Sequence, residues 1–207
     1  MAAKLQRASD RLLEEFTELQ MSDIAQVAGL ARSSLYYYFA NKDDVLAYLL
    51  RAVLADLNAT SSAAASGPGT PSERLAAVIR AQLEHLDRYS SSAQYLFANL
   101  GRAGELAEIA ARVTDGYYVP VKKLLVEGAA DGTFRALPDV DLGASTLHGA
   151  VLAIGLRALV TEGRIDVDLA TATVGTIVWG GIAPGDHSAL RQTGSAEHST
   201  TLGSPIT

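Results

Sequence analysis

The residue types between positions 32 and 42 are those with which proteins contact nucleic acid. The candidates are Arg32, Ser33, Ser34, Tyr36, Tyr37 and Lys42. An arginine matches the hydrogen-bonding edge of guanine, and small hydroxyl side chains let a helix come close to the bases. Tyrosine and lysine can bind backbone phosphates, which hold a protein in register on the duplex. Gathered on one surface, these side chains could read a DNA sequence.

Two short helices joined by a tight turn would gather them. Apolar residues spaced i, i+3 and i+4 predict a helix over 21–28, and Gly29 provides the positive φ that a sharp exit needs. A second helix is predicted over 32–39, with Leu35 and Phe39 facing inward. Its outward residues then include most of the candidates, and Tyr38 is expected to pack. This arrangement is a helix-turn-helix, although two ordinary core helices joined by a turn would share part of the pattern.

The segment resembles the DNA-binding motif of the TetR family of bacterial regulators, whose pattern is roughly I-A-x-x-A-G-V-S-x-x-x-L-Y-x-Y/H-F-x-x-K. The matching residues are Ile24, Ala25, Ala28, Gly29, Leu35, Tyr36, Tyr38, Phe39 and Lys42. The resemblance is sharp over residues 20–50 and architectural beyond them. It implies a dimer that binds a near-palindromic, double-stranded DNA operator as a repressor, with Lys42 on a backbone phosphate. It also implies release by a small apolar effector.

Three features depart from that pattern. Ala31 stands where the family has a serine that caps the reading helix, and the join after Phe16 is shorter and lacks the usual polar cap. The net charge is −6 at pH 7, and the first fifty residues hold five basic against seven acidic side chains, a net −2. These departures favour an alternative function, a dimeric helical ligand-binding or interaction module with a weak or vestigial DNA head.

The periodicity predicts an all-α fold without strands. A three-helix helix-turn-helix domain (1–45) is joined by a long helix, capped by Asn41, to a helical ligand-binding and dimerisation domain (46–183). Residues 184–207 are expected to form a disordered tail. The expected helices cover 3–17, 21–28, 32–39, 42–57, 71–88, 91–100, 104–130, 140–161 and 167–179, with a linker at 61–69 and a bend near 116–120.

The last two predicted helices, 140–161 and 167–179, are rich in small and apolar residues and carry almost no charge. We expect them to form the interface of a homodimer, since burial within one subunit would need further chain to cover them. The resemblance places a small-molecule pocket in the larger domain, where the candidates are Tyr95, Phe97, Tyr117 and His148. Each could instead be a core side chain whose polar tip is satisfied.

Several kinds of site lack the residues that they need. The chain has no cysteine, and no histidine follows a glutamate by three residues as helical di-iron sites require. No phosphate loop or nucleophile elbow is present, so we expect no enzyme, cofactor or metal. No apolar signal segment is seen, and the apolar stretch at 149–156 is short, so we expect a cytoplasmic protein without a membrane segment.

Overall fold

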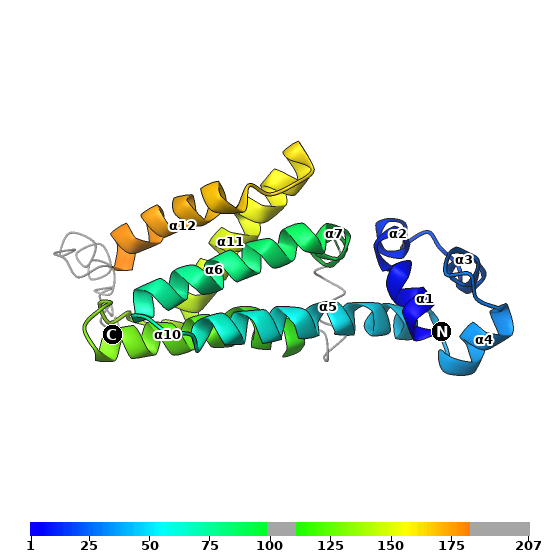
Figure 1. Cartoon of the computed structure of the whole chain (residues 1–207), viewed down its shortest axis with the longest axis horizontal. Helices are drawn as coiled ribbons and strands as arrows, with labels where there is room; N and C mark the ends of the chain where they lie inside the picture. The colour runs from blue at the N-terminus through cyan, green and yellow to red at the C-terminus, as the bar shows by residue number, and fades with distance from the viewer. Residues whose placement is uncertain (99–110, 183–207) are drawn as a thin grey trace, which may run out of the picture.

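The computed structural model of the chain describes residues 1–98 and 111–182, and every regular element in these ranges is a helix. A small cluster of helices, α1 to α4, lies at one end, and a longer bundle lies at the other (Figure 1). We call residues 1–41 the head and residues 42–182 the body. The all-α fold predicted from the sequence is confirmed.

The head consists of α1 (Ala2–Arg7), α2 (Ser9–Glu14), α3 (Met21–Val27) and α4 (Arg32–Tyr38). The last two match the predicted helices of the helix-turn-helix closely. The single helix predicted over 3–17 is wrong, because the backbone breaks at Ala8 (φ −97°, ψ 0°) and helix α2 ends at Glu14. Leucine and isoleucine side chains from all four helices nevertheless meet in one buried core, which fixes the angles between them.

Helix α5 (Lys42–Ala65) is continuous from the head into the body. Asn41 caps it as predicted, since its Oδ1 accepts the backbone N–H of Asp44 at 2.9 Å. The predicted domain division at residue 45 falls inside its first turn. The predicted linker is wrong over its first five residues, because the helix continues to Ala65, where the buried Ser61 and Ala65 pack into the core. Packing outweighs the turn-forming composition there.

The body adds α6 (Pro71–Arg88), α7 (Ser90–Ala98), the π-helical turn η1 (Thr114–Tyr118), α10 (Val119–Ala130), α11 (Val140–Glu162) and α12 (Val167–Ile182). Helix α6 is central, because it contacts α5, α10, α11 and α12. The π-helical turn η1 lies where the sequence predicted a bend near residues 116–120. Residues 104–110 of the predicted seventh helix, and the predicted tail 184–207, lie outside the described residues.

The predicted starts of the body helices at residues 71, 140 and 167 are confirmed, and local capping residues mark them. Thr70 and Glu73 form a capping box before α6. The carboxylates of Asp139 and Asp166 accept backbone N–H groups at the starts of α11 and α12. Gly132, with φ of 83°, follows the end of α10. These local signals set where each helix begins and ends, so the bundle keeps its register.

Among the described helices, α11 alone is long and apolar enough by length and composition to cross a membrane. It packs against α6, α10 and α12, and Val151 and Leu159 on its inner side are buried. Core helices of bundles have the same composition, so this is weak evidence for a membrane span. The expected absence of a membrane segment therefore stays a prediction.

Candidate nucleic-acid interface

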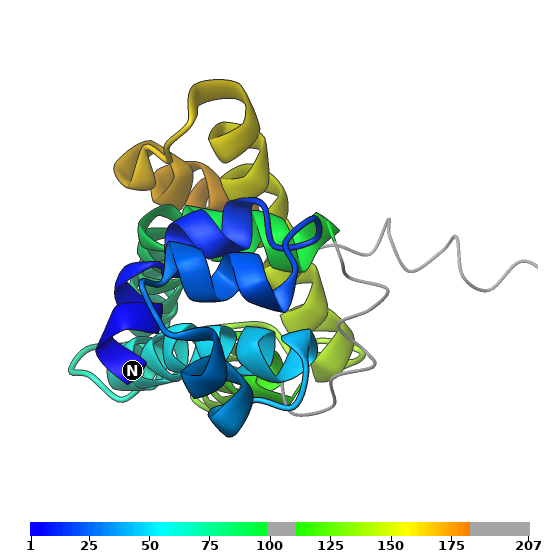
Figure 2. The same ribbon diagram turned by 90° about the vertical axis from the view of Figure 1, so that its right-hand side faces the viewer.

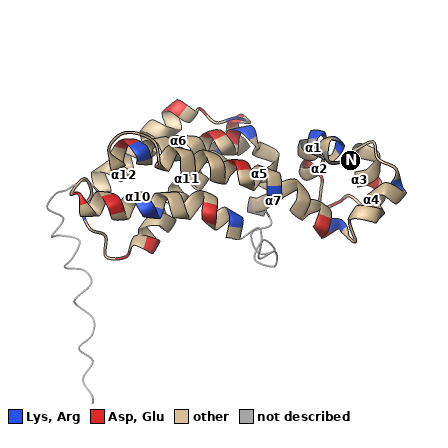
Figure 3. Ribbon diagram, turned by 60° about the horizontal axis from the view of Figure 1, so that its bottom comes forward, with Lys and Arg blue, Asp and Glu red and all other residues tan. Residues whose placement is uncertain are grey.

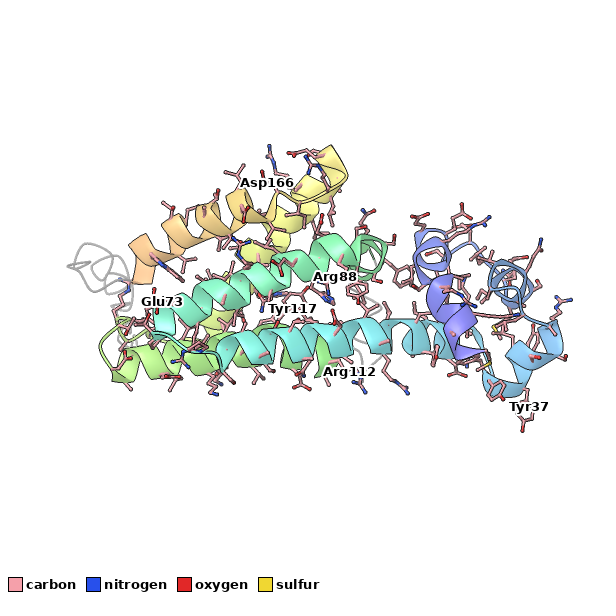
Figure 4. The ribbon with its side chains drawn as sticks, viewed as in Figure 1. Tyr37, Glu73, Arg88, Arg112, Tyr117 and Asp166 are labelled. Atoms are coloured by element: carbon pink, nitrogen blue, oxygen red, sulfur yellow. The ribbon has the colours of Figure 1, made fainter. Side chains whose placement is uncertain are left out.

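Helix α4 presents a polar, aromatic surface at the end of the head. Arg32 and Ser33 are exposed, Ser34 is half-buried, and Tyr36 and Tyr37 expose 52% and 81% of their surface. Figure 4 shows Tyr37 pointing away from the rest of the structure, and Figure 2 shows α3 and α4 on the near side when the molecule is viewed from the head. The structure thus brings the predicted base-reading residues together on one accessible face.

The same helix is anchored by its apolar side. Leu35 is fully buried and Phe39 nearly so, and the Phe39 ring stands against Tyr48 of α5 with centroids 5.5 Å apart. Because Leu35 and Phe39 are four residues apart, they share a face opposite to the exposed polar residues. The sequence therefore sets both the burial and the exposure of this helix.

Tyr38 was expected to pack, and the structure corrects this. Its side chain is 60% exposed, and its ring stands edge-on to Tyr37 with centroids 4.9 Å apart. The ring of Tyr38 therefore adds to the exposed surface that the predicted reading residues form. Tyr38 is the last residue of α4, where the helical spacing that predicted packing ends.

The two helix starts in the motif differ in their capping. Ala31 precedes α4 and no side chain caps that helix, as the sequence indicated. The start of α3, which also lacks the family's usual cap, is nevertheless capped, because the Asp23 carboxylate accepts the backbone N–H of Gln20 at 2.8 Å. An aspartate in the first turn also lies at the positive end of the helix dipole. The missing cap therefore concerns α4 and not α3.

Lys42 lies at the first position of α5, beside the reading helix. Its ammonium donates to the carbonyl oxygen of Thr17 at 2.8 Å and lies 5.0 Å from the centroid of the Phe16 ring. An ammonium has three donors, so a phosphate can still be bound while this contact is kept. The contact holds the lysine in one position between α2 and α5.

Two predicted pocket residues meet inside the body. The ring centroids of Tyr117 and His148 are 4.5 Å apart, and those of Tyr118 and His148 are 4.7 Å apart. Both Tyr117 and His148 are buried. Burial lowers the pKa of His148 to about 4 and raises the pKa of the Tyr117 phenol. Both groups are therefore neutral at physiological pH.

Gln82 joins this cluster and was missed by sequence reasoning. It is fully buried on α6, and its Nε2 donates to the carbonyl oxygen of Tyr117 at 3.1 Å. A glutamine on the apolar face of α6, between Ile79 and Leu86, was the signal that could have indicated it. Within the described residues, Gln82 Oε1 and His148 Nδ1 have no hydrogen-bond partner. Buried polar atoms are usually hydrogen-bonded, so two unpartnered atoms in this cluster are unusual.

The other two pocket candidates are placed differently. Tyr95 is half-buried on α7 and its ring packs against Phe16 of the head, with centroids 5.7 Å apart. The side chain of Phe97 lies outside the described residues. Tyr95 therefore belongs to the junction between head and body.

The outer side of α11 is apolar and exposed. A groove of about 460 Å³ on this side is mostly apolar and is lined by Gly149, Leu152, Ala153, Leu156, Arg157, Val160 and Thr161. On the same helix Val160 is 77% exposed, and Leu169 and Ile177 of α12 are 65% and 69% exposed. Apolar surface of this kind, next to small residues, is typical of an interface between subunits.

Comparisons with known proteins agree with this arrangement. A model of the bacterial regulatory proteins of the tetR family matches residues 8–49. The chain is 26% identical over 137 residues to the fatty acid metabolism regulator protein of Bacillus subtilis, which covers 66% of this chain and 71% of that protein.

Solved structures share the fold over most of the chain. The transcriptional regulator FadR from Bacillus subtilis, in complex with stearoyl-CoA, aligns with a TM-score of 0.75 and 22% identity over 88% of this chain and 100% of that one. A TetR/AcrR family regulator from Thermobifida fusca aligns with a TM-score of 0.67 and 26% identity, over 87% and 97% of the two chains. Residues 8–49 of the chain therefore match the bacterial regulatory proteins of the tetR family, and the helical body has the fold of solved TetR-family regulators.

Proposed function

We propose that this protein is a dimeric repressor that binds a near-palindromic operator through α4 and leaves it when an apolar ligand occupies the body. The observation that carries the proposal is the exposure of Arg32, Ser33 and Tyr37 on a helix whose opposite face is buried. Such a helix can enter the major groove without disturbing the core of the head.

The dimer would form through α11 and α12. Their exposed apolar residues and the groove on α11 support this pairing. Two heads related by a twofold axis would contact successive major grooves on one side of the duplex, about 34 Å apart, and so select a near-palindrome. A ligand that favours another spacing of the heads would shift the population away from the DNA-binding state.

The ligand is proposed to be a long-chain acyl thioester. The relatives named for fatty acid metabolism and the stearoyl-CoA complex support this class. The buried cluster of Gln82, Tyr117 and His148 supports it too, since it offers unpartnered polar atoms within an otherwise apolar bundle. An acyl chain would lie among the apolar side chains, and its polar end would use the unpartnered atoms.

The first experiment is selection of bound duplexes from a random DNA library by the purified, ligand-free protein at moderate salt. An enriched near-palindrome supports a dimeric sequence reader. The matched control is Arg32→Ala, which should bind without the same base preference. Stearoyl-CoA is then added to the operator complex, with CoA alone as the control. Release by the acylated compound and not by CoA supports the ligand class.

A second function is favoured by the missing cap of α4 and the acidic composition of the head. In that case the protein is a dimeric ligand-binding or interaction module whose head binds DNA weakly. Failure to enrich any duplex, with folded and dimeric protein, would favour this second function.

A further inference from the structure

A groove on the head is lined on one wall by basic side chains. Lys4, Arg7 and Arg11 lie at i, i+3 and i+7, so the break at Ala8 leaves them on one side of α1 and α2. The opposite wall is formed by Val27–Gly29, the end of α3 and the start of the turn that leads to α4. The groove has a volume of about 410 Å³. Figure 3 shows the basic segments on α1.

The two arginines of this groove have donors available for a ligand. Both are exposed, and neither makes an ion pair or hydrogen bond with a side chain that the structure describes. In the body, by contrast, three arginines are paired with carboxylates. These pairs are Arg74 with Glu127, Arg80 with Asp168 at 2.6 Å and Arg88 with Asp56 at 3.4 Å. The two arginines of the groove thus differ from these three, whose guanidinium groups are paired with carboxylates.

The groove adjoins the reading helix. The ammonium of Lys4 donates to the carbonyl oxygen of Gly29 at 2.8 Å, which ties the start of α1 to the turn. Arg32, the first residue of α4, follows Gly29 by three positions. Basic side chains therefore continue from the start of the reading helix along α1 and α2.

The positions of these basic side chains matter because the N-terminal fifty residues are acidic overall. The first fifty residues have a net charge of −2, with five basic side chains. Three of the five line the groove, and the other two, Arg32 and Lys42, lie at the starts of α4 and α5. DNA responds to the local charge on a protein surface as well as to the protein's net charge. This cluster of basic side chains can therefore attract DNA although the first fifty residues are acidic overall.

We propose that this groove binds backbone phosphates of one DNA strand beside the major groove that α4 occupies, with Arg7 and Arg11 as the contacting residues. The proposal rests on the proposed DNA-binding function and extends the contact surface beyond the helix-turn-helix. The row from Lys4 to Arg11 is about 10 Å long along the helices. Each strand carries one phosphate per about 3.4 Å of duplex axis, so a row of this length is long enough for the two phosphate contacts assigned to the arginines. These contacts add affinity without base preference.

The test compares the full-length chain with the double variant Arg7→Gln/Arg11→Gln on a mixed-sequence duplex and on the selected operator, over a range of salt concentrations. Loss of two phosphate contacts should reduce the slope of log K against log salt by about 1.8. The affinity for the two duplexes should fall by the same factor, and the base preference should stay unchanged. The variant Arg7→Lys/Arg11→Lys should keep most of the slope, because it keeps both charges.

The matched control is Lys123→Gln/Arg135→Gln, which removes the same charge from the body. An equal effect of the two double variants would mean that total charge matters and would overturn the proposal. An unchanged salt slope in Arg7→Gln/Arg11→Gln would also overturn the proposal, provided that thermal unfolding shows the variant to be folded. The proposed DNA-binding function would still stand in that case, because the protein would bind DNA without this groove. If the unaltered protein binds neither duplex, both the groove and the proposed function fail.

Discussion

The ring of Phe16 in the head stands edge-on to the ring of Tyr95 on α7, with centroids 5.7 Å apart and planes at 85°. A second contact lies beside it, where the Ser91 hydroxyl donates to Glu14 Oε1 at 3.4 Å. The end of α2 therefore rests on α7. The orientation of the head is held by this junction as well as by the continuous helix α5.

Replacing Tyr95 with alanine should loosen this junction. An edge-to-face ring pair contributes about 0.5–1.5 kcal/mol beyond the area that it buries. We expect faster amide hydrogen exchange across α1 to α4 in Tyr95→Ala, with little change in α10 and α12. Tyr95→Phe, which keeps the ring, should exchange more slowly than the alanine variant. Equal exchange in the unaltered protein and the alanine variant would show that the ring pair does not hold the head.

Arg32→Ala and Lys42→Ala should differ in what they do to DNA binding. Loss of Arg32 should relax the preference at one base position, because its guanidinium matches a base edge. Loss of Lys42 should weaken binding evenly on all sequences and reduce the salt slope by about 0.9. Binding titrations on the selected operator and its single-base variants measure both. Identical effects of the two substitutions would contradict the assigned roles.

Lys42→Ala should also destabilise the head without DNA, unlike Arg32→Ala. Its ammonium lies over the Phe16 ring and donates to Thr17, whereas Arg32 makes no such contact with the described residues. An exposed cation–π contact contributes about 0.5–1 kcal/mol. Thermal unfolding of both variants measures the difference.

A charge on the outer face of α11 or α12 should separate the proposed dimer. Ala153→Arg and Ile177→Arg each place a cation on the apolar surface, where it would be buried unpaired in the dimer. We expect monomers by sedimentation at micromolar protein concentration. Val126→Arg alters a 53% exposed valine of α10 and is the control. Dimers that persist in both test variants would move the interface elsewhere.

His148 should make stability depend on pH. Burial lowers its pKa to about 4 from an ordinary value of 6.5, so the unfolded chain binds a proton more readily than the folded chain. The stabilisation is complete above pH 6.5 and is lost as the pH falls toward about 4, by roughly 3 kcal/mol.

Denaturant unfolding at several pH values measures this loss. In His148→Gln the loss over the same range should be smaller. It should not vanish, because burial also lowers the pKa of His85 to about 4, outweighing the opposing effect of Asp56. The same pH dependence in the variant and the unaltered protein would show that His148 is not the group that titrates.

Much of the head could be predicted because its signals are local. The spacing of Ile24, Ala28 and Leu35 sets the two helices and their buried faces, and Gly29, with φ of 61°, makes the turn between them. The capping residues at the starts of the body helices are local signals of the same kind, because each lies within a few residues of the helix start that it sets. Elements whose ends depend on distant packing were predicted less well, as at Ala8 and at Ser61, where composition pointed to other boundaries.

The site in the body was only partly predictable. Tyr117 and His148 were selected because they are polar or aromatic within apolar helices, and their rings do meet. Tyr95 met the same criterion and lies at the junction instead. The difference arises because helical periodicity gives the face of a side chain, but not which neighbouring element that face meets.

The π-helical turn η1 packs against α5, the helix that connects the body to the head. A Cβ added at Gly116 would come within 2.6 Å of the Leu57 side chain, so η1 lies directly against α5. Lys42 is about 22 Å from Leu57 along that helix. A tilt of α5 by about 5° about this contact would displace Lys42 by about 2 Å.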